Sequence, residues 1–191
     1  GRLTVEENDI TITKMAFEYE RAGRTPADVL ARVNRAVLGA TVDGNFITAF
    51  YCSIDCANNI MRCASAGHVP ALLFHRGDGA VEPVKPRGKP LGLVDEPGIA
   101  EMEVRLHPGD RLVLYTDGII ECSDAGGKMF GTEALSDLVA KSAGSAPAEF
   151  SGMLVERLRG FSGADFFEDD ITLLILDVRL RAPGSPVSAG H

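Results

Sequence analysis

Two acidic segments beside strand-like sequence could bind a divalent metal ion. Asp117 follows the apolar segment 111–115 and precedes Gly118. The second segment lies directly before the apolar run 171–178 and holds four acids within six residues: Asp165, Glu168, Asp169 and Asp170. Like charges at this spacing repel one another, and a divalent cation relieves that repulsion. Two strand ends that carry aspartates therefore favour an oxygen-ligand site for Mg²⁺ or Mn²⁺.

Each acidic segment also has a simpler interpretation. Asp-Gly pairs such as Asp117-Gly118 are common in turns, because both residue types tolerate left-handed backbone geometry. A run of acids before a strand is often only a solvated loop. Taken separately, neither segment decides between a metal site and a surface loop.

Three further features have chemical potential. Gly67 and Pro70 bracket His68 in a short link between two strand-like segments, where the imidazole could act as a general acid, a ligand or a structural hydrogen-bonding group. Arg87 and Lys89 lie in a loop rich in Pro and Gly, where they could contact a phosphate or an acidic partner, or serve as exposed solubilising charges. No Ser-His-Asp order, G-x-S-x-G or Walker-type motif is present in the sequence, so serine-hydrolase and P-loop chemistry have no support.

Cysteine and histidine spacing does not indicate a structural zinc site. The four cysteines contain no C-x-x-C pair, and the four histidines add no zinc-ligand pattern. In a reducing cytosol we expect the cysteines to be buried thiols that behave as small apolar residues.

Composition limits the class of protein. The chain has 191 residues, of which 45% are hydrophobic, so it can form one domain with a full core. A net charge of −8 disfavours binding to nucleic acid or to anionic membranes. We find no apolar run long enough to span a bilayer and no signal-type start, so we expect a cytosolic protein.

The hydrophobic pattern predicts an α+β fold in which helices pack on antiparallel sheet. Helices are predicted at 12–19, from an N-cap at Thr25 with Pro26 in the first turn, after a cap at Thr132, and at 150–161. The first long helix should bury a stripe formed by Val29, Leu30, Val33, Ala36, Val37 and Ala40. Short strands joined by hairpins are predicted at 46–54, 60–66, 71–75, 80–84, 100–106 and 111–115. The apolar run 171–178 should form a strand covered on both faces, and 181–191 a disordered tail.

Six sequence blocks, in order and with compatible spacing, resemble one known family. The chain is similar to the SpoIIE/RsbU branch of the PPM metal-dependent protein phosphatases from about Thr25 to Asp177. The blocks that carry the resemblance are 46–51, 64–73, 89–92, 109–119, 130–131 and 169–172.

The resemblance implies an α-β-β-α sandwich with two Mn²⁺ or Mg²⁺ ions, and direct attack of water on phosphoserine or phosphothreonine. Asp117 and Asp169 then correspond to metal ligands, with Gly118 and Asp170 adjacent to the metal. Gly67, His68 and Pro70 correspond to a structural link between strands. The implied substrate is a phosphorylated STAS-domain anti-sigma-factor antagonist in bacterial partner switching. Upstream sensor or receiver domains often regulate such phosphatases.

The sequence departs from the family pattern at its start. The family's Gly-Asp strand motif and its Asp-x-x-Gly-x-Gly turn, which supplies a bridging carboxylate, are absent before the predicted helix 12–19. We therefore expect residues 1–180 to form a phosphatase domain that lacks its first strands and holds Mg²⁺ poorly. Open sheet edges would favour a homo-oligomer or a partner. Two interpretations stay open: part of a longer active phosphatase, or a non-catalytic phosphatase-like module that binds a regulatory partner.

Overall fold

The chain forms two compact units, described here from a computed structural model of residues 23–38, 46–163, 167 and 169–179. Unit 1 comprises the described residues up to Pro70 together with Lys85–Leu106, and unit 2 comprises Ala71–Val84 together with the described residues from His107 onward. The predicted helix at 12–19 and the predicted tail at 181–191 lie outside the described residues.

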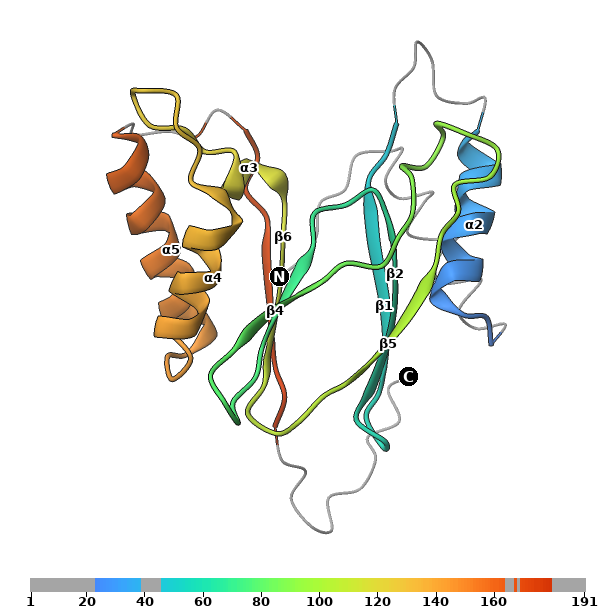
Figure 1. Cartoon of the computed structure of the whole chain (residues 1–191), viewed down its shortest axis with the longest axis horizontal. Coiled ribbons are helices and arrows are strands. Elements are labelled where there is room, and N and C mark those ends of the chain that lie inside the picture. The colour runs from blue at the N-terminus through green and yellow to red at the C-terminus, as the bar shows by residue number, and fades with distance from the viewer. Residues whose placement is uncertain (1–22, 39–45, 164–166, 168, 180–191) are drawn as a thin grey trace. The chain divides into compact units, whose positions relative to one another are not determined.

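Unit 1 is a helix packed on a three-stranded antiparallel sheet. Helix α2 (Pro26–Val37) packs against strands β1 (Ala49–Asp55) and β2 (Ile60–Ala66), and β5 (Glu101–Arg105) completes the sheet in the order β1-β2-β5 (Figure 1). The predicted cap is confirmed: the Thr25 hydroxyl accepts a hydrogen bond from the Asp28 amide, and the Asp28 carboxylate accepts one from the Thr25 amide.

The buried face of α2 differs from the predicted stripe, in which Val37 is only half-buried and Ala40 lies outside the described residues. Val29, Leu30 and Val33 are buried as expected, but Ala36 is exposed and Asn34 is fully buried in its place. The Asn34 side-chain amide donates to the carbonyls of Val94 and Asp95, and its oxygen accepts from the Gly92 amide. These three hydrogen bonds compensate for the loss of water around the buried Asn34 amide. They also tie the loop 92–95 to the helix.

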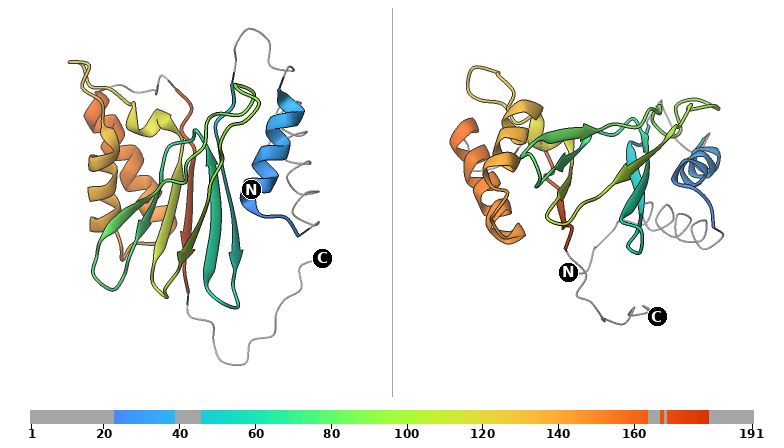
Figure 2. Two further views of the ribbon diagram at one scale, coloured as in Figure 1. Left: turned by 45° about the vertical axis from the view of Figure 1, so that its right-hand side comes forward. Right: turned by 60° about the horizontal axis from the view of Figure 1, so that its bottom comes forward.

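Unit 2 is a four-stranded antiparallel sheet covered by helices. Its strands lie in the order β4 (Val81–Val84), β3 (Ala71–Phe74), β6 (Arg111–Tyr115) and β7 (Leu173–Asp177). A short helix α3 (Asp117–Ile120) follows β6, and helices α4 (Gly131–Lys141) and α5 (Pro147–Ser162) lie over one face of the sheet (Figure 2). Their buried faces present Leu135, Val139, Phe150, Leu154 and Leu158 to the core.

The start of α4 corrects a prediction. Thr132 is not the cap: the helix begins at Gly131, and the N-cap is Phe130, which makes no capping hydrogen bond through a side chain. Phe130 is buried and meets Phe161 edge-on, with 5.4 Å between the ring centroids. Aromatic packing against α5 therefore sets this helix start, overriding the local capping preference.

Strand β7 and the strand connections correct two more predictions. Strand β7 lies at the edge of its sheet, and Leu174 is 55% exposed, so the strand is not covered on both faces within the described part of the chain. A short apolar run does not reveal its place in a sheet. The links β2–β3, β4–β5 and β5–β6 are also not hairpins, because each joins a strand of one sheet to a strand of the other.

The cysteines differ in part from the expectation that they are buried thiols. All four cysteines are thiols, but only Cys63 is buried, and Cys56 is exposed. Burial raises the pKa of the Cys63 thiol to about 12, so this sulfur stays protonated at neutral pH.

Within the described ranges, no helix combines the length and apolar character needed to cross a membrane.

Arg111 fixes the start of β6 with a buried polar network. The residue is 3% exposed, and its guanidinium forms a fork with the Asp177 carboxylate of β7 at 2.6 and 3.0 Å. The same side chain donates to the carbonyls of Ser142 and Ser145 after α4 and lies over the Phe150 ring. One residue thus joins β6, β7, α4 and α5.

We expect Arg111→Met to lower the free energy of unfolding by about 2–4 kcal/mol, because Asp177 and two carbonyls lose their partner. Arg62→Met is the matched control, since the Arg62–Glu103 ion pair in unit 1 is half exposed and its loss should cost under about 1 kcal/mol. Urea unfolding measures both. Equal losses in the two variants would contradict the role assigned to Arg111.

Candidate functional site

The carboxyl end of β6 is fastened to the segment that leads into β7. Antiparallel pairing sets Tyr115 opposite Leu173. One residue further on, the Thr116 amide donates to the Thr172 carbonyl at 3.1 Å. The Thr116 hydroxyl donates to the Asp170 carbonyl at 3.0 Å and accepts from the Thr172 amide at 2.9 Å. Thr116 therefore holds the chain just before β7 against the end of β6.

This attachment places the two predicted metal-binding segments side by side. A Cβ atom added to Gly118 would lie 2.7 Å from the Asp170 carbonyl oxygen and 3.4 Å from the Asp169 Cβ. Only a glycine allows this approach, since a side chain would displace the carbonyl. Asp117 is the first residue of α3, one position before this contact. Residues 117–118 and 169–170, about fifty positions apart in sequence, therefore meet at one strand end.

The residue types at this strand end are those that a hard divalent cation prefers, although the carboxylates of Asp117, Asp169 and Asp170 do not all lie within 4.8 Å of one another. The side chains of Asp117, Asp169 and Asp170 are exposed, and the Asp169 carboxylate accepts the Asp170 amide at 2.8 Å. Carboxylate and carbonyl oxygens are the ligands that Mg²⁺ and Mn²⁺ prefer. The neighbouring Tyr115 phenol is buried, and burial raises its pKa, so it stays neutral near pH 7.

The predicted link between strands lies in unit 1. Gly67 adopts a positive φ of 71°, and a Cβ there would lie 2.6 Å from the Pro90 ring. His68 Nδ1 is 3.3 Å from the Thr48 hydroxyl. His68, Pro70 and Arg87 line one open pocket together with Lys85, whereas Lys89 is not among its lining residues. The loop thus brings Arg87 close to the link.

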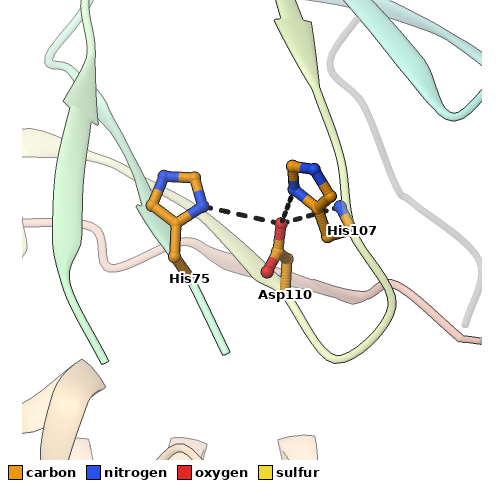
Figure 3. A group of neighbouring side chains, drawn as sticks. All are labelled: His75, His107 and Asp110. Carbon is orange, nitrogen blue, oxygen red and sulfur yellow. Dashed lines mark hydrogen bonds and ion pairs between the residues drawn. The ribbon is translucent and has the colours of Figure 1, made fainter. Parts of the chain in front are cut away.

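A third cluster was missed by the sequence analysis. His75, His107 and Asp110 offer ligand atoms that all lie within 4.8 Å of one another, in the one group of three or more such residues found in the described ranges (Figure 3). Common zinc motifs place their ligands in close pairs along the chain, whereas strand pairing assembles this cluster. The sequence holds one indication of it, since His75 ends the predicted strand 71–75 and His107 shortly precedes the predicted strand 111–115.

Comparisons with known proteins agree with this architecture. The family model described as Stage II sporulation protein E (SpoIIE) matches residues 10–179. Phosphoserine phosphatase RsbU of Bacillus subtilis is 28% identical over 155 residues, which are 81% of this chain and 45% of RsbU. The chain thus spans less than half the length of that relative.

Solved structures give the same fold. A structure of the RsbU and RsbW domains of a Mycobacterium tuberculosis protein is 28% identical, with a TM-score of 0.73, and the match covers 91% of this chain and 47% of the other. The SpoIIE phosphatase domain of Bacillus subtilis, Mn presoaked, is 20% identical, with a TM-score of 0.64 over 96% of this chain and 79% of that domain. The predicted class, antiparallel sheets flanked by helices, is confirmed.

We expect Gly118→Ala to push the Asp170 carbonyl away from β6 and to lower the free energy of unfolding by about 1–3 kcal/mol, because the added methyl has no room. Gly152→Ala in α5 is the control, since no atom lies within 4 Å of its Cβ position. Two-dimensional NMR of the amides should show large shifts at 169–172 in the first variant alone. Unchanged amide signals at 169–172 in Gly118→Ala would refute the close contact.

Proposed function

The chain belongs to the SpoIIE family, and from this membership we propose that it is a metal-dependent phosphatase that removes phosphate from phosphoserine or phosphothreonine in proteins. The match over residues 10–179 is the observation that carries the proposal. The relative RsbU is named a phosphoserine phosphatase, which supports the choice of reaction.

We assign the metal-holding role to Asp117 and Asp169, with Gly118 and Asp170 adjacent. The contact between Gly118 and Asp170 supports the assignment, because it brings both aspartates to one strand end. Mn²⁺ or Mg²⁺, when bound, supplies positive charge to the phosphate oxygens and lowers the pKa of a water. Thr116 positions the Asp169 segment through its bond to the Asp170 carbonyl. In this proposal the carboxylates of Asp117 and Asp169 hold the metal ion, and they do not attack the phosphorus atom themselves.

The proposed substrate is a phosphorylated STAS-domain regulator in bacterial partner switching, in the cytosol. The likeness to a structure that holds RsbU and RsbW domains supports this class of pathway. The net charge of −8 repels an acidic phosphoprotein, so its recognition needs local positive charge on this chain. We propose that Arg87 and Lys89 contact a phosphate or an acidic face of the phosphoprotein partner, and Arg87 lines the pocket beside His68.

We expect Asp117→Asn and Asp169→Asn each to reduce Mn²⁺-dependent phosphate release from a phosphorylated STAS protein by at least about 100-fold, because each removes a metal-binding charge. The assay compares the 191-residue chain with any longer product of its gene. Asp137→Asn on the exposed face of α4 is the control and should keep full activity. Full activity in Asp117→Asn would show the assignment to be wrong, and tight binding of the phosphoprotein without turnover in every form would identify a non-catalytic module.

We expect the double variant Arg87→Glu/Lys89→Glu to raise KM by roughly 10-fold with little change in kcat, since two cations that meet the phosphoprotein become anions. Arg157→Glu/Arg159→Glu on the exposed face of α5 makes the same charge change and serves as control. Steady-state kinetics at fixed ionic strength measures both. Equal KM values in the two double variants would remove the role of Arg87 and Lys89.

A further inference from the structure

Strand pairing brings two imidazoles and one carboxylate to the end of β6 opposite Asp117. Phe74 of β3 pairs with Arg111 of β6, so the next residues outward are His75 and Asp110. A tight turn folds His107 back to the same place, with the Asp110 amide donating to the His107 carbonyl at 3.0 Å. From Asp110 to Asp117 the chain covers about 20 Å at the usual rise of a strand. The cluster is thus separate from the proposed phosphatase site.

The ligand atoms have the spacing of a tetrahedral metal site. Asp110 Oδ2 lies 3.6 Å from His75 Nδ1 and 3.5 Å from His107 Nδ1, and both rings turn toward it (Figure 3). Both distances exceed the range of a good hydrogen bond. They are close to the ~3.3 Å that separates two ligands of a tetrahedral Zn²⁺ whose bonds are ~2.0–2.1 Å long. Since all three ligand atoms lie within 4.8 Å of one another, they can reach one shared ion.

Neighbouring groups hold the ligands in the orientation that metal binding needs. The Asp110 side chain is 1% exposed, and its carboxylate accepts the amides of Arg76 at 3.0 Å and His107 at 2.8 Å. His75 Nε2 lies 3.4 Å from a Glu82 carboxylate oxygen. A proton on Nε2 leaves the Nδ1 lone pair aimed at Asp110, which is the carboxylate–histidine arrangement common around zinc.

The turn that carries His107 is rigid, and its surroundings are open to solvent. Gly109 has a φ of 93°, and a Cβ there would lie 2.8 Å from the Arg76 side chain. Pro108 further restricts the turn. His107 is 63% exposed and His75 is 23% exposed, so an ion can enter from water. Asp78 and Glu82 line the same open pocket and add negative charge.

We propose that His75, His107 and Asp110 bind one divalent transition-metal ion of the Zn²⁺ type. Two imidazoles with one carboxylate favour Zn²⁺, Co²⁺ or Ni²⁺ over Mg²⁺ and Mn²⁺, which prefer oxygen ligands. The ion joins the end of β3 to the turn before β6, with Glu82 orienting His75. Three protein ligands leave a coordination position for water or for a ligand from a partner.

Titration of the 191-residue chain with Zn²⁺, followed by calorimetry, tests the proposal. We expect one site with a micromolar or tighter Kd, and at least a 10-fold weaker Kd in His75→Gln and in His107→Gln. His68→Gln in unit 1 is the matched control and should bind as the unaltered chain does. Co²⁺ in place of Zn²⁺ should give the intense visible absorption of a tetrahedral site in the unaltered chain and in His68→Gln alone.

Thermal stability and phosphate release separate failure of the zinc proposal from failure of the proposed function. Zn²⁺ should raise the thermal midpoint of the unaltered chain but not of the double variant His75→Gln/His107→Gln, whose circular dichroism reports whether it is folded. Phosphate release with Mn²⁺ should be the same in both, so failure of the proposed function leaves this test intact. Equal Zn²⁺ affinity in the folded double variant, or no Zn²⁺ binding at 10-fold excess over a protein concentration of roughly 100 µM, would overturn the proposal.

Discussion

Strand β6 pairs with β3 on one side and with β7 on the other, and this pairing determines what each end of the strand can do. Its register with β7 brings the chain before Leu173 alongside Thr116, so that Gly118 and Asp170 touch. Its register with β3 brings His75 next to Asp110. Arg111 secures both arrangements, because its buried guanidinium ties β6 to Asp177 and to the carbonyls after α4. If β6 slipped by one residue, both groups would separate.

The two ends of β6 offer different chemistry. Beyond Tyr115 the donors are exposed aspartates, which suit Mg²⁺ or Mn²⁺ and the phosphoryl chemistry of the SpoIIE family. Before Arg111 the donors are two imidazoles and one buried carboxylate, which suit a softer ion. Because the same strand holds both groups, we expect the type of ligand atom to decide which metal ion each end binds. An ion at the second end would stiffen the sheet without entering the reaction.

Local sequence signals predicted much of the architecture but not the long-range contacts. The cap at Thr25 and the strands 60–66 and 111–115 follow from side-chain preferences, and the structure has them. The helix start at Phe130 and the exposed edge of β7 depend on packing partners that are distant in sequence. The two acidic segments stand out because they border apolar runs, whereas the choice of Asp117 and Asp169 among their acids came from the resemblance to the family. The cluster at His75 was missed because its members come together only through the pairing of Phe74 with Arg111.

We propose that pairing of β6 with β7 allows one cation to bind residues that are about fifty positions apart in sequence. Paramagnetic broadening of amide NMR signals by low concentrations of Mn²⁺ tests it most directly, because the effect falls steeply with distance from the ion. We expect the signals of Gly118 and Asp170 to broaden together, at the same Mn²⁺ concentration and before those of the exposed acids Asp137 and Glu156. Broadening at only one of the two segments, or equal broadening at all exposed acids, would contradict it.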